Sequence, residues 1–304
     1  MNNRSLQPFA QMSGLPEQAE QICRETLFHI DAEALAGSFF ACRREAVSLL
    51  SSQAPGAQLG YFPDGFYPEH AFFEPAKRQF DTAQINRNTG FLAILLSFAA
   101  RTWEIYREYS IPETVFRSSI GELGKAAWGF YKQNGFWGIS DYVWLNCFFL
   151  PELYTVGALQ FRLCAFPYER FDTGHGILHK NDPVVQLHVP EHADLSVPSL
   201  DYAYRGAYAL FGIPYFLADS WLLYPPHREM LSPDSAIRRF MDGFAIIETD
   251  ETDDYEGLWR IFGKKADYRT EPLACDTSLQ RAYALRVKEN KPIGSAVGIR
   301  YYKP

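Results

Sequence analysis

The chain is poor in cysteine, in positive charge and in long apolar runs, and each shortage excludes a class of protein. Its 304 residues include five widely spaced cysteines and no CxxC pair. This argues against a disulfide framework and favours reduced thiols in the cytoplasm. The net charge of −7 leaves no basic excess to replace phosphate counterions, so no nucleic-acid partner is expected. The longest apolar run, residues 91–100, is about half a membrane span, so no membrane segment is expected.

Several catalytic signatures are also missing. The sequence has no P-loop, no Rossmann glycine fingerprint and no GxSxG elbow, which disfavours phosphate transfer, dinucleotide chemistry and serine hydrolysis. Two His-x-x-x-His spacings occur, His175/His179 and His188/His192, but glycine or proline breaks a helix at both. In a strand such residues are about 13 Å apart, so no metal is expected. Cys164 with His188 is a conceivable nucleophile pair, but nothing beside Cys164 would lower its pKa.

At roughly 150 residues per domain, the length of the chain predicts about two domains. Apolar residues make up 47% and charged residues 21%, as in soluble globular proteins. Up to about residue 150 the apolar spacing predicts helices. These helices begin at Pro16, cover about 33–52 and 88–109, run from Pro112 to Asn134, and end with a shorter helix through Phe149. Residues 61–75 are rich in proline and aromatics and predict a loop.

After Pro151 strands alternate with helices. Strands are predicted at about 159–166, at 177–180 as its partner, and at 184–189, 213–223, 258–262 and 296–302. Helices are predicted at about 197–211, from Ser232 to Phe244, and from a Thr277/Gln280 capping box to Lys288. The run Glu248 to Glu256 carries six acids and predicts a solvated loop, or alternatively a site that attracts a cation. The expected fold is α+β (α/β-like), with a helical domain at 1–150 and a mixed-sheet domain at 151–304.

Several long phrases resemble a bacterial acyltransferase family that joins a helical N-terminal domain to a GNAT-like C-terminal domain. The matching stretches are residues 111–145, 153–163, 184–190, 219–244, 258–263 and 276–282. In that superfamily an amine attacks an acyl-CoA thioester directly, without a covalent enzyme intermediate. The resemblance implies that the strand at 184–189 splays from the strand at 216–223, with the pantetheine arm between them. It also implies that the turn 190–199 holds the pyrophosphate at a helix N-terminus, where free N–H groups and the helix dipole favour an anion.

This turn departs from the superfamily pattern, which is Gln/Arg-x-x-Gly-x-Gly/Ala. Residues 190–199 contain no glycine, their two prolines donate no N–H, and Glu191 and Asp194 have the wrong charge for a phosphate ligand. The residues expected to bind the cofactor, acetyl-CoA or another acyl-CoA, are Val189, His192, Ser196, Ser199 and Arg205. Because this turn offers few groups that bind a pyrophosphate, there is an alternative function. It is a non-catalytic GNAT-like module that holds a small metabolite or a protein partner in a cleft between the domains.

Four residues are candidates for catalysis, each with an ordinary structural role as the alternative. His188 lies where superfamily members often place a general base, and a neutral imidazole there can take a proton from the attacking amine near pH 7. Glu191 is the alternative base. Ser220 is placed to donate to the thioester oxygen or to the departing thiolate, and Tyr224 is the possible general acid.

Three further residues are candidates for substrate contact. Asp219 can hold a cationic amine, beside Trp221, for which a place in the core is the alternative. Tyr67 belongs to the aromatic loop 61–75, which can either wall a substrate between the domains or pack them together. The resulting hypothesis is acyl transfer from acyl-CoA to a small-molecule amine, without a metal.

Overall fold

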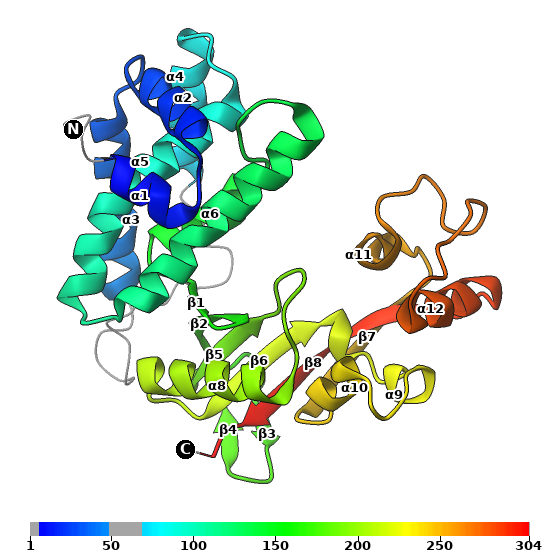
Figure 1. Cartoon of the computed structure of the whole chain (residues 1–304). Helices are drawn as coiled ribbons and strands as arrows, with labels where there is room; N and C mark the ends of the chain where they lie inside the picture. Colours follow the sequence, from blue (N-terminus) through cyan, green and yellow to red (C-terminus); the bar gives the residue numbers. More distant parts are fainter. Residues whose placement is uncertain (1–5, 49–68, 304) are drawn as a thin grey trace.

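The computed structural model describes residues 6–48 and 69–303, and it has a helical part followed by a part built on a sheet (Figure 1). The helical part contains α1 (Leu6–Ser13), α2 (Glu17–Leu27), α3 (Ala32–Ser48), the π-helical turn η3 (Glu69–Phe73), α4 (Glu74–Thr82), α5 (Arg87–Glu108), α6 (Glu113–Asn134) and α7 (Tyr142–Phe149). This confirms the predicted helices. The helices α1 and α4 were not predicted, and η3 and α4 show that the predicted loop at 61–75 was wrong at its C-terminal end. Residues 61–68, including Tyr67, lie outside the described residues.

The long helices begin and end where local chemistry dictates. Asn86 caps α5 by accepting hydrogen bonds from the backbone amides of Asn88 and Thr89. Gly135 ends α6 at φ +77°, a left-handed conformation that glycine adopts without strain. Gly124 lets α1 approach α6 closely, because a Cβ there would lie 1.7 Å from the carbonyl oxygen of Ser13.

The helix α5 forms the centre of the helical core. Its residues from Gly90 to Ala99 are all buried, so it is apolar all round, as an interior helix should be. Aromatic rings surround it: Phe98 stacks on Phe39 with ring centroids 4.6 Å apart, and Phe91 meets Phe80 edge-on at 5.1 Å. Packing of this kind holds the helical part as a rigid unit.

The second part is a mixed six-stranded sheet in the order β1-β2-β5-β6-β8-β7, beside a separate β3-β4 hairpin. The strands are β1 (Tyr154–Val156), β2 (Leu159–Ala165), β3 (Arg170–Asp172), β4 (Ile177–His179), β5 (Pro183–His188), β6 (Tyr215–Ser220), β7 (Ala245–Thr252) and β8 (Ile293–Tyr301). The helical segments are α8 (Val197–Phe211), η4 (Trp221–Leu223), α9 (His227–Met230), α10 (Ala236–Met241), η5 (Glu256–Leu258), α11 (Trp259–Phe262) and α12 (Ser278–Lys288). The predicted architecture, a helical region followed by a mixed-sheet region, is confirmed.

Four local predictions were wrong. The expected strand at 258–262 is the helical pair η5 and α11, and the helix expected from Ser232 begins at Ala236. The segment 177–180 was expected to pair with the strand at 159–166. It forms β4 and pairs with β3 across the turn at 172–176, whereas the strand at 159–166 pairs with β1 and β5. The acidic run forms part of β7, which pairs only with β8 at the edge of the sheet. The side chains of an edge strand can all face water, so β7 shows no apolar alternation.

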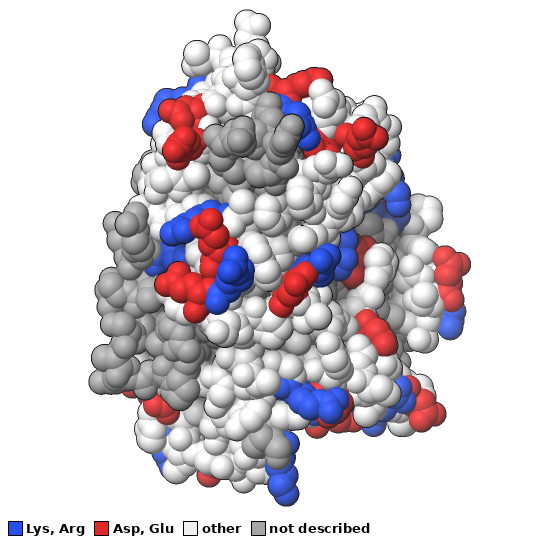
Figure 2. All heavy atoms as spheres, turned by 60° about the vertical axis from the view of Figure 1, so that its left-hand side comes forward, with Lys and Arg blue, Asp and Glu red and all other residues white. Residues whose placement is uncertain are grey.

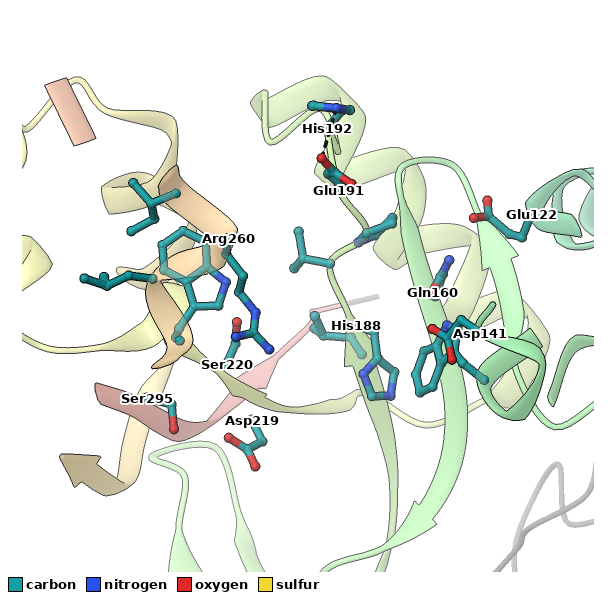
Figure 3. Close-up of a pocket in the computed structure, with 18 of the residues that line it drawn as sticks. Glu122, Asp141, Gln160, His188, Glu191, His192, Asp219, Ser220, Arg260 and Ser295 are labelled. Carbon is teal, nitrogen blue, oxygen red and sulfur yellow. Dashed lines mark ion pairs between the residues drawn. The ribbon is translucent and has the colours of Figure 1, made fainter. Parts of the chain in front are cut away.

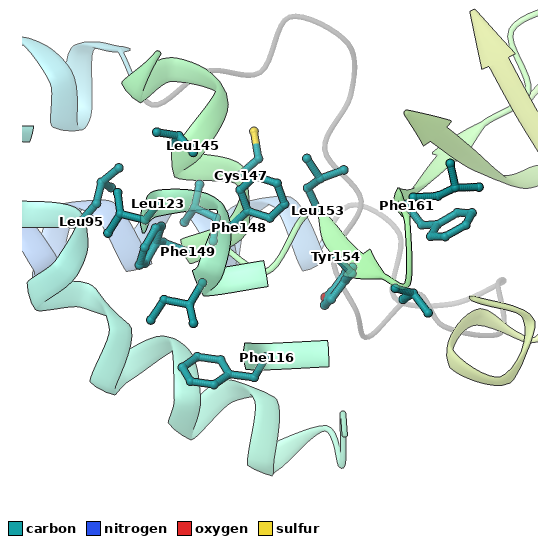
Figure 4. Close-up of a cluster of buried hydrophobic side chains, with 14 of the residues drawn as sticks. Leu95, Phe116, Leu123, Leu145, Cys147, Phe148, Phe149, Leu153, Tyr154 and Phe161 are labelled. Carbon is teal, nitrogen blue, oxygen red and sulfur yellow. The ribbon is translucent and has the colours of Figure 1, made fainter. Parts of the chain in front are cut away.

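Apolar packing joins the helical part to the sheet (Figure 4). The Tyr154 side chain on β1 is fully buried, and its ring centroid lies 5.7 Å from Tyr106 on α5 and 5.8 Å from Phe211 on α8. The backbone amide of Thr155 donates to the Ser119 hydroxyl on α6 at 2.9 Å. These contacts fix the position of α5 and α6 relative to the sheet, and α6 and the sheet both border the site described below.

Charged side chains of the helical part are largely paired. On the face shown in Figure 2, basic and acidic groups lie beside one another. Pairs within helices include Arg101–Glu104 at 2.5 Å, Arg117–Glu113 at 2.6 Å and Lys125–Glu122 at 2.7 Å. This face therefore presents mixed charge.

Candidate active site

The strands β5 and β6 separate part-way along their length. They pair in parallel at only two positions, Val185 with Phe216 and Gln186 with Leu217. Beyond these, β5 stays paired with β2 as far as His188, and β6 stays paired with β8 as far as Ser220. The predicted divergence of these two strands is therefore confirmed, and their last residues face an opening.

A cavity of about 1210 Å³ lies at this opening, between the helical part and the sheet (Figure 3). Its walls come from α6, α7, the ends of β5 and β6, the start of β8, the segment 257–261 and α12. The predicted site residues that line it are His188, Val189, Glu191, His192, Asp219, Ser220 and Trp221. The strand separation thus brings together most of the candidates that flank it in sequence.

His188 and Asp219 lie on the same face of the sheet, on opposite sides of the opening. Gln186 and Leu217 are paired neighbours, and His188 and Asp219 each follow two residues later. Since side chains alternate between faces along a strand, both point to the face that Gln186 and Leu217 share. A reactant between the diverging strands would have the imidazole on one side and the carboxylate on the other.

The imidazole of His188 is uncharged at neutral pH. Burial, and secondly the charge of Arg162, lower its pKa to about 3. Its Nε2 atom is buried and has no hydrogen-bond partner among the described residues. The ring of Trp144, on α7, meets it edge-on with centroids 4.8 Å apart. Trp144 was not among the predicted site residues, because α7 is largely apolar and its pattern indicates only core.

Asp219 lies in an acidic environment. Partial burial raises the pKa of its carboxyl group, and Asp250 and Glu248 raise it further. Asp219 and Glu248 both pair with Val297 on β8, from opposite sides, and Asp250 pairs with Ser295. The sheet therefore gathers carboxylates from β6 and β7 on one face. The sequence indicated the charges of the acidic run, but not that β7 would place them beside Asp219.

In the turn after β5, residues 190–196, a carboxylate of the turn itself takes up hydrogen-bond donors. The Asp194 carboxylate accepts hydrogen bonds from the backbone amide and the hydroxyl of Ser196, both at 2.9 Å. These bonds, together with one from the Ser199 hydroxyl, hold the pKa of Asp194 below its usual range. Arg205 donates to Asp201 at 3.1 Å. Ser196, Ser199 and Arg205, predicted to bind the cofactor, are not among the described residues that line the cavity.

Tyr224 is likewise not among the lining residues. Its hydroxyl donates to Glu251 Oε1 at 2.5 Å and accepts from Arg286 Nη2 at 3.0 Å. Burial and the bond to Glu251 raise the pKa of Tyr224 to about 12. A different tyrosine, Tyr283 on α12, lines the cavity. Tyr224 therefore lies outside the lining of the cavity, although it was predicted to act there as a general acid.

Tyr283 is held by a buried histidine. The Nδ1 atom of His227 lies 3.2 Å from the carbonyl oxygen of Leu222, and its Nε2 atom lies 2.6 Å from the Tyr283 hydroxyl. A carbonyl oxygen only accepts, so Nδ1 carries the proton and Tyr283 donates to Nε2. Burial lowers the pKa of His227 to about 4, which keeps this arrangement at neutral pH.

No group of three or more His, Cys, Asp or Glu side chains in residues 6–48 and 69–303 is arranged to hold a metal ion. No helix within the same ranges has both the length and the apolar character needed to cross a bilayer.

Comparison with protein families accounts for nearly the whole chain. Residues 6–149 match the N-acyltransferase N-terminal domain, and residues 153–300 match the GNAT-like C-terminal domain. The chain belongs to this acyltransferase family. Comparison with curated proteins gives no match.

Solved structures of acyltransferases share the fold of this acyltransferase at low sequence identity. One, in complex with decanoyl-CoA and teicoplanin, is 19% identical over 99% of this chain and 88% of that chain, with a TM-score of 0.67. Another, in complex with CoA and 10C-teicoplanin, is 18% identical over 98% and 87%, also at 0.67. A third, in complex with decanoyl-CoA, is 16% identical over 98% and 99%, at 0.61.

Proposed function

We propose that this acyltransferase moves an acyl group from acyl-CoA to a small-molecule amine in the cavity between the helices and the sheet. The observation that carries the proposal is the separation of β5 from β6 directly beside a large cavity. A separated strand edge presents backbone groups that a chain of amides, such as the pantetheine arm, can bind as an added strand would. The acyl-CoA complexes of the structural neighbours support the same class of donor.

The two sides of the opening suit the two reactants. On the helical side, Trp144, Leu145 and Phe148 form an apolar patch for an acyl chain, beside Ala126 and Gly129 of α6. The same side also carries Glu122, Lys125 and Asp141. Asp219 and Asp250 line the other side, where a protonated amine is attracted. The acceptor therefore enters from the carboxylate side, and the thioester lies between Asp219 and His188.

Proton transfer accompanies the attack. The ammonium group first gives up one proton, through Asp219, to water. The free amine then attacks the thioester carbon, and the C–S bond breaks to release the CoA thiolate. As the new C–N bond forms, the nitrogen becomes far more acidic, so a neutral imidazole of low basicity can accept its second proton. His188 takes that proton and passes it to the thiolate, which restores the neutral ring.

The rival function is a binding module without turnover. It is favoured by the turn after β5, where Asp194 occupies the hydroxyl and amide groups expected to hold a pyrophosphate. The two functions differ in whether a thioester is consumed.

Measurements of ligand binding and of thiol release distinguish the transferase from the binding module. We expect acetyl-CoA, octanoyl-CoA or decanoyl-CoA to raise the melting temperature, since a ligand at a hundredfold excess over its Kd adds about 2.7 kcal/mol of stability. With a panel of amines, free CoA thiol should then appear in step with N-acylated product, measured by a thiol-reactive chromophore and mass spectrometry. A shift without thiol release for any amine favours the binding module, and no shift with any acyl-CoA refutes the transferase.

A further inference from the structure

A buried amide side chain borders the cavity on the side that the proposed function gives to the acyl chain. Gln160 on β2 is only 4% exposed, yet it lines the cavity. Its side chain has no hydrogen-bond partner among the described residues. An amide offers two N–H donors and a carbonyl acceptor, and leaving them unpaired once a ligand excludes water costs free energy. Gln160 is therefore expected to bind a polar group of the ligand.

The strand register places Gln160 directly beside His188. The two residues are paired across β2 and β5, so their side chains share one face of the sheet, with Cβ atoms about 5 Å apart. The next pair shows the same arrangement, because the Arg162 side chain donates to Gln186. In Figure 3, Gln160 and His188 both lie across the opening from Asp219. The amide and the imidazole are therefore neighbouring polar groups on one side of the opening.

An acyl chain that starts at the proposed position of the thioester passes this amide. The strand order β2-β5-β6 places Gln160, His188 and Asp219 in that order across the sheet. The thioester is proposed to lie between His188 and Asp219, and the apolar patch begins at Trp144, whose ring contacts His188. A chain that runs from the thioester to this patch crosses β5 toward Gln160. Since neighbouring strands are only about 4.8 Å apart, the amide meets the first few carbons of the chain.

The other polar groups on the helical side are already paired or exposed. Glu122 and Lys125 form an ion pair at 2.7 Å, and Asp141 is exposed. Gln160 is the buried group, and a plain alkyl chain would remove water from it without replacing the lost hydrogen bonds. A hydroxyl near the thioester would replace them. A hydroxyl on C3 is the first that lies clear of the thioester carbonyl and of His188.

We infer that the donor of this acyltransferase is a 3-hydroxyacyl-CoA, whose hydroxyl binds the Gln160 amide. The inference rests on the proposed function, because it requires acyl-CoA to be the donor. The hydroxyl can donate to the amide oxygen or accept from the amide N–H. Because the amide lies to one side of the chain, it should bind the hydroxyl of one enantiomer only. His188 stays available for the proton of the attacking amine.

Calorimetric titration with octanoyl-CoA and with each enantiomer of 3-hydroxyoctanoyl-CoA tests the inference, and it does not require the acceptor. The unmutated protein should bind one hydroxylated enantiomer about tenfold or more tightly than octanoyl-CoA, because only that donor pairs the buried amide. Gln160→Met keeps an unbranched side chain and removes the amide. This variant should bind the favoured enantiomer more weakly and octanoyl-CoA more tightly, so that the preference disappears.

The matched control is Leu145→Met, a volume-conserving exchange on the same side of the cavity, which should leave the preference in place. Octanoyl-CoA that binds to the unmutated protein as tightly as both hydroxylated donors overturns the inference, and so does a preference that survives in Gln160→Met. If none of the three donors binds, the proposed function fails as well, whereas tight binding without preference overturns this inference alone.

Discussion

The two sides of the cavity differ in origin and in chemistry. The side next to β5 is lined from the helical part by Trp144, Leu145 and Phe148, and the imidazole of His188 there is desolvated. The side next to β6 carries Asp219 and Asp250, and burial and mutual repulsion raise the pKa of Asp219. The helical side also carries Glu122, Lys125 and Asp141, so it is its apolar patch that suits an acyl chain, whereas the carboxylates beside β6 suit an amine.

This difference follows from the topology. The helices supply the first wall because β1 and α6 pack together, and the sheet supplies the second because β7 returns beside β8. The site therefore needs both the helical part and the sheet. The account therefore predicts that changes on the two walls affect different quantities.

The largest expected effect is the loss of turnover on removing the imidazole. His188→Ala should lower kcat by at least about a hundredfold, because a positioned general base contributes about 10²- to 10⁴-fold. The affinity for acyl-CoA should stay within a few-fold. Initial rates and calorimetry measure the two, with the exposed His179→Ala as the control. Turnover that survives in His188→Ala removes this residue from the mechanism.

The acidic wall should determine the use of a cationic acceptor. Asp219→Asn keeps the shape and removes the charge, so kcat/KM for a protonated amine should fall about tenfold, with acyl-CoA affinity unchanged. The control is Asp201→Asn, an exposed carboxylate on α8 outside the cavity. A parallel loss of acyl-CoA affinity in Asp219→Asn would place this carboxylate on the donor side instead.

The desolvated histidines should make the fold sensitive to acid. The pKa of His188 is about 3 in the folded chain against an ordinary 6.5, so the unfolded chain binds more protons between these values. Stability is complete above about pH 6.5 and falls as the pH drops, by about 2 kcal/mol at pH 5. His227, with a pKa of about 4, adds a similar loss.

Denaturant unfolding at pH 8 and pH 5 checks this linkage. His188→Gln should recover about half of the loss that the two buried histidines cause in the unmutated chain, and the exposed His179→Gln should recover none. An equal pH dependence in all three proteins would mean that His188 is hydrated and titrates normally.

The smallest expected effect concerns the length of the acyl chain. A Cβ at Gly129 meets no atom within 4 Å, so Gly129→Leu places a side chain in the cavity without a clash in the fold. Turnover with decanoyl-CoA should fall several-fold relative to acetyl-CoA. Gly129→Ala reports the helix-propensity effect alone, about 1 kcal/mol of added stability. An unchanged chain-length preference would show that the acyl chain lies elsewhere.

Local sequence signals predicted most of the fold. Caps and breakers placed α6 and α12 correctly, because Gly135 and the Thr277 capping box act through adjacent residues. The strand β7 was missed because an exposed edge strand needs only backbone partners, which no pattern of its own side chains reveals. The segment 258–262 was predicted as a strand, yet it forms the end of η5 and α11, which buries Leu258 in a separate small apolar cluster.

The site was predicted in outline only. His188, Asp219 and Ser220 could be placed because strand ends flank the opening that the resemblance implied. Trp144 and Arg260 could not, since each reaches the cavity from a distant segment through tertiary packing. The Tyr224 hydroxyl, expected to face the cavity, binds Glu251, a residue from the unpredicted strand β7.

Hydrogen exchange on the free and acyl-CoA-bound protein tests the central claim most directly. If the donor's arm occupies the opening, its amides must bind the diverging edges of β5 and β6. The account predicts slower exchange in peptides that cover 185–189 and 216–220 when octanoyl-CoA is added, with no comparable change in α2. Tight binding that leaves both strand ends exchanging at their original rates would contradict it.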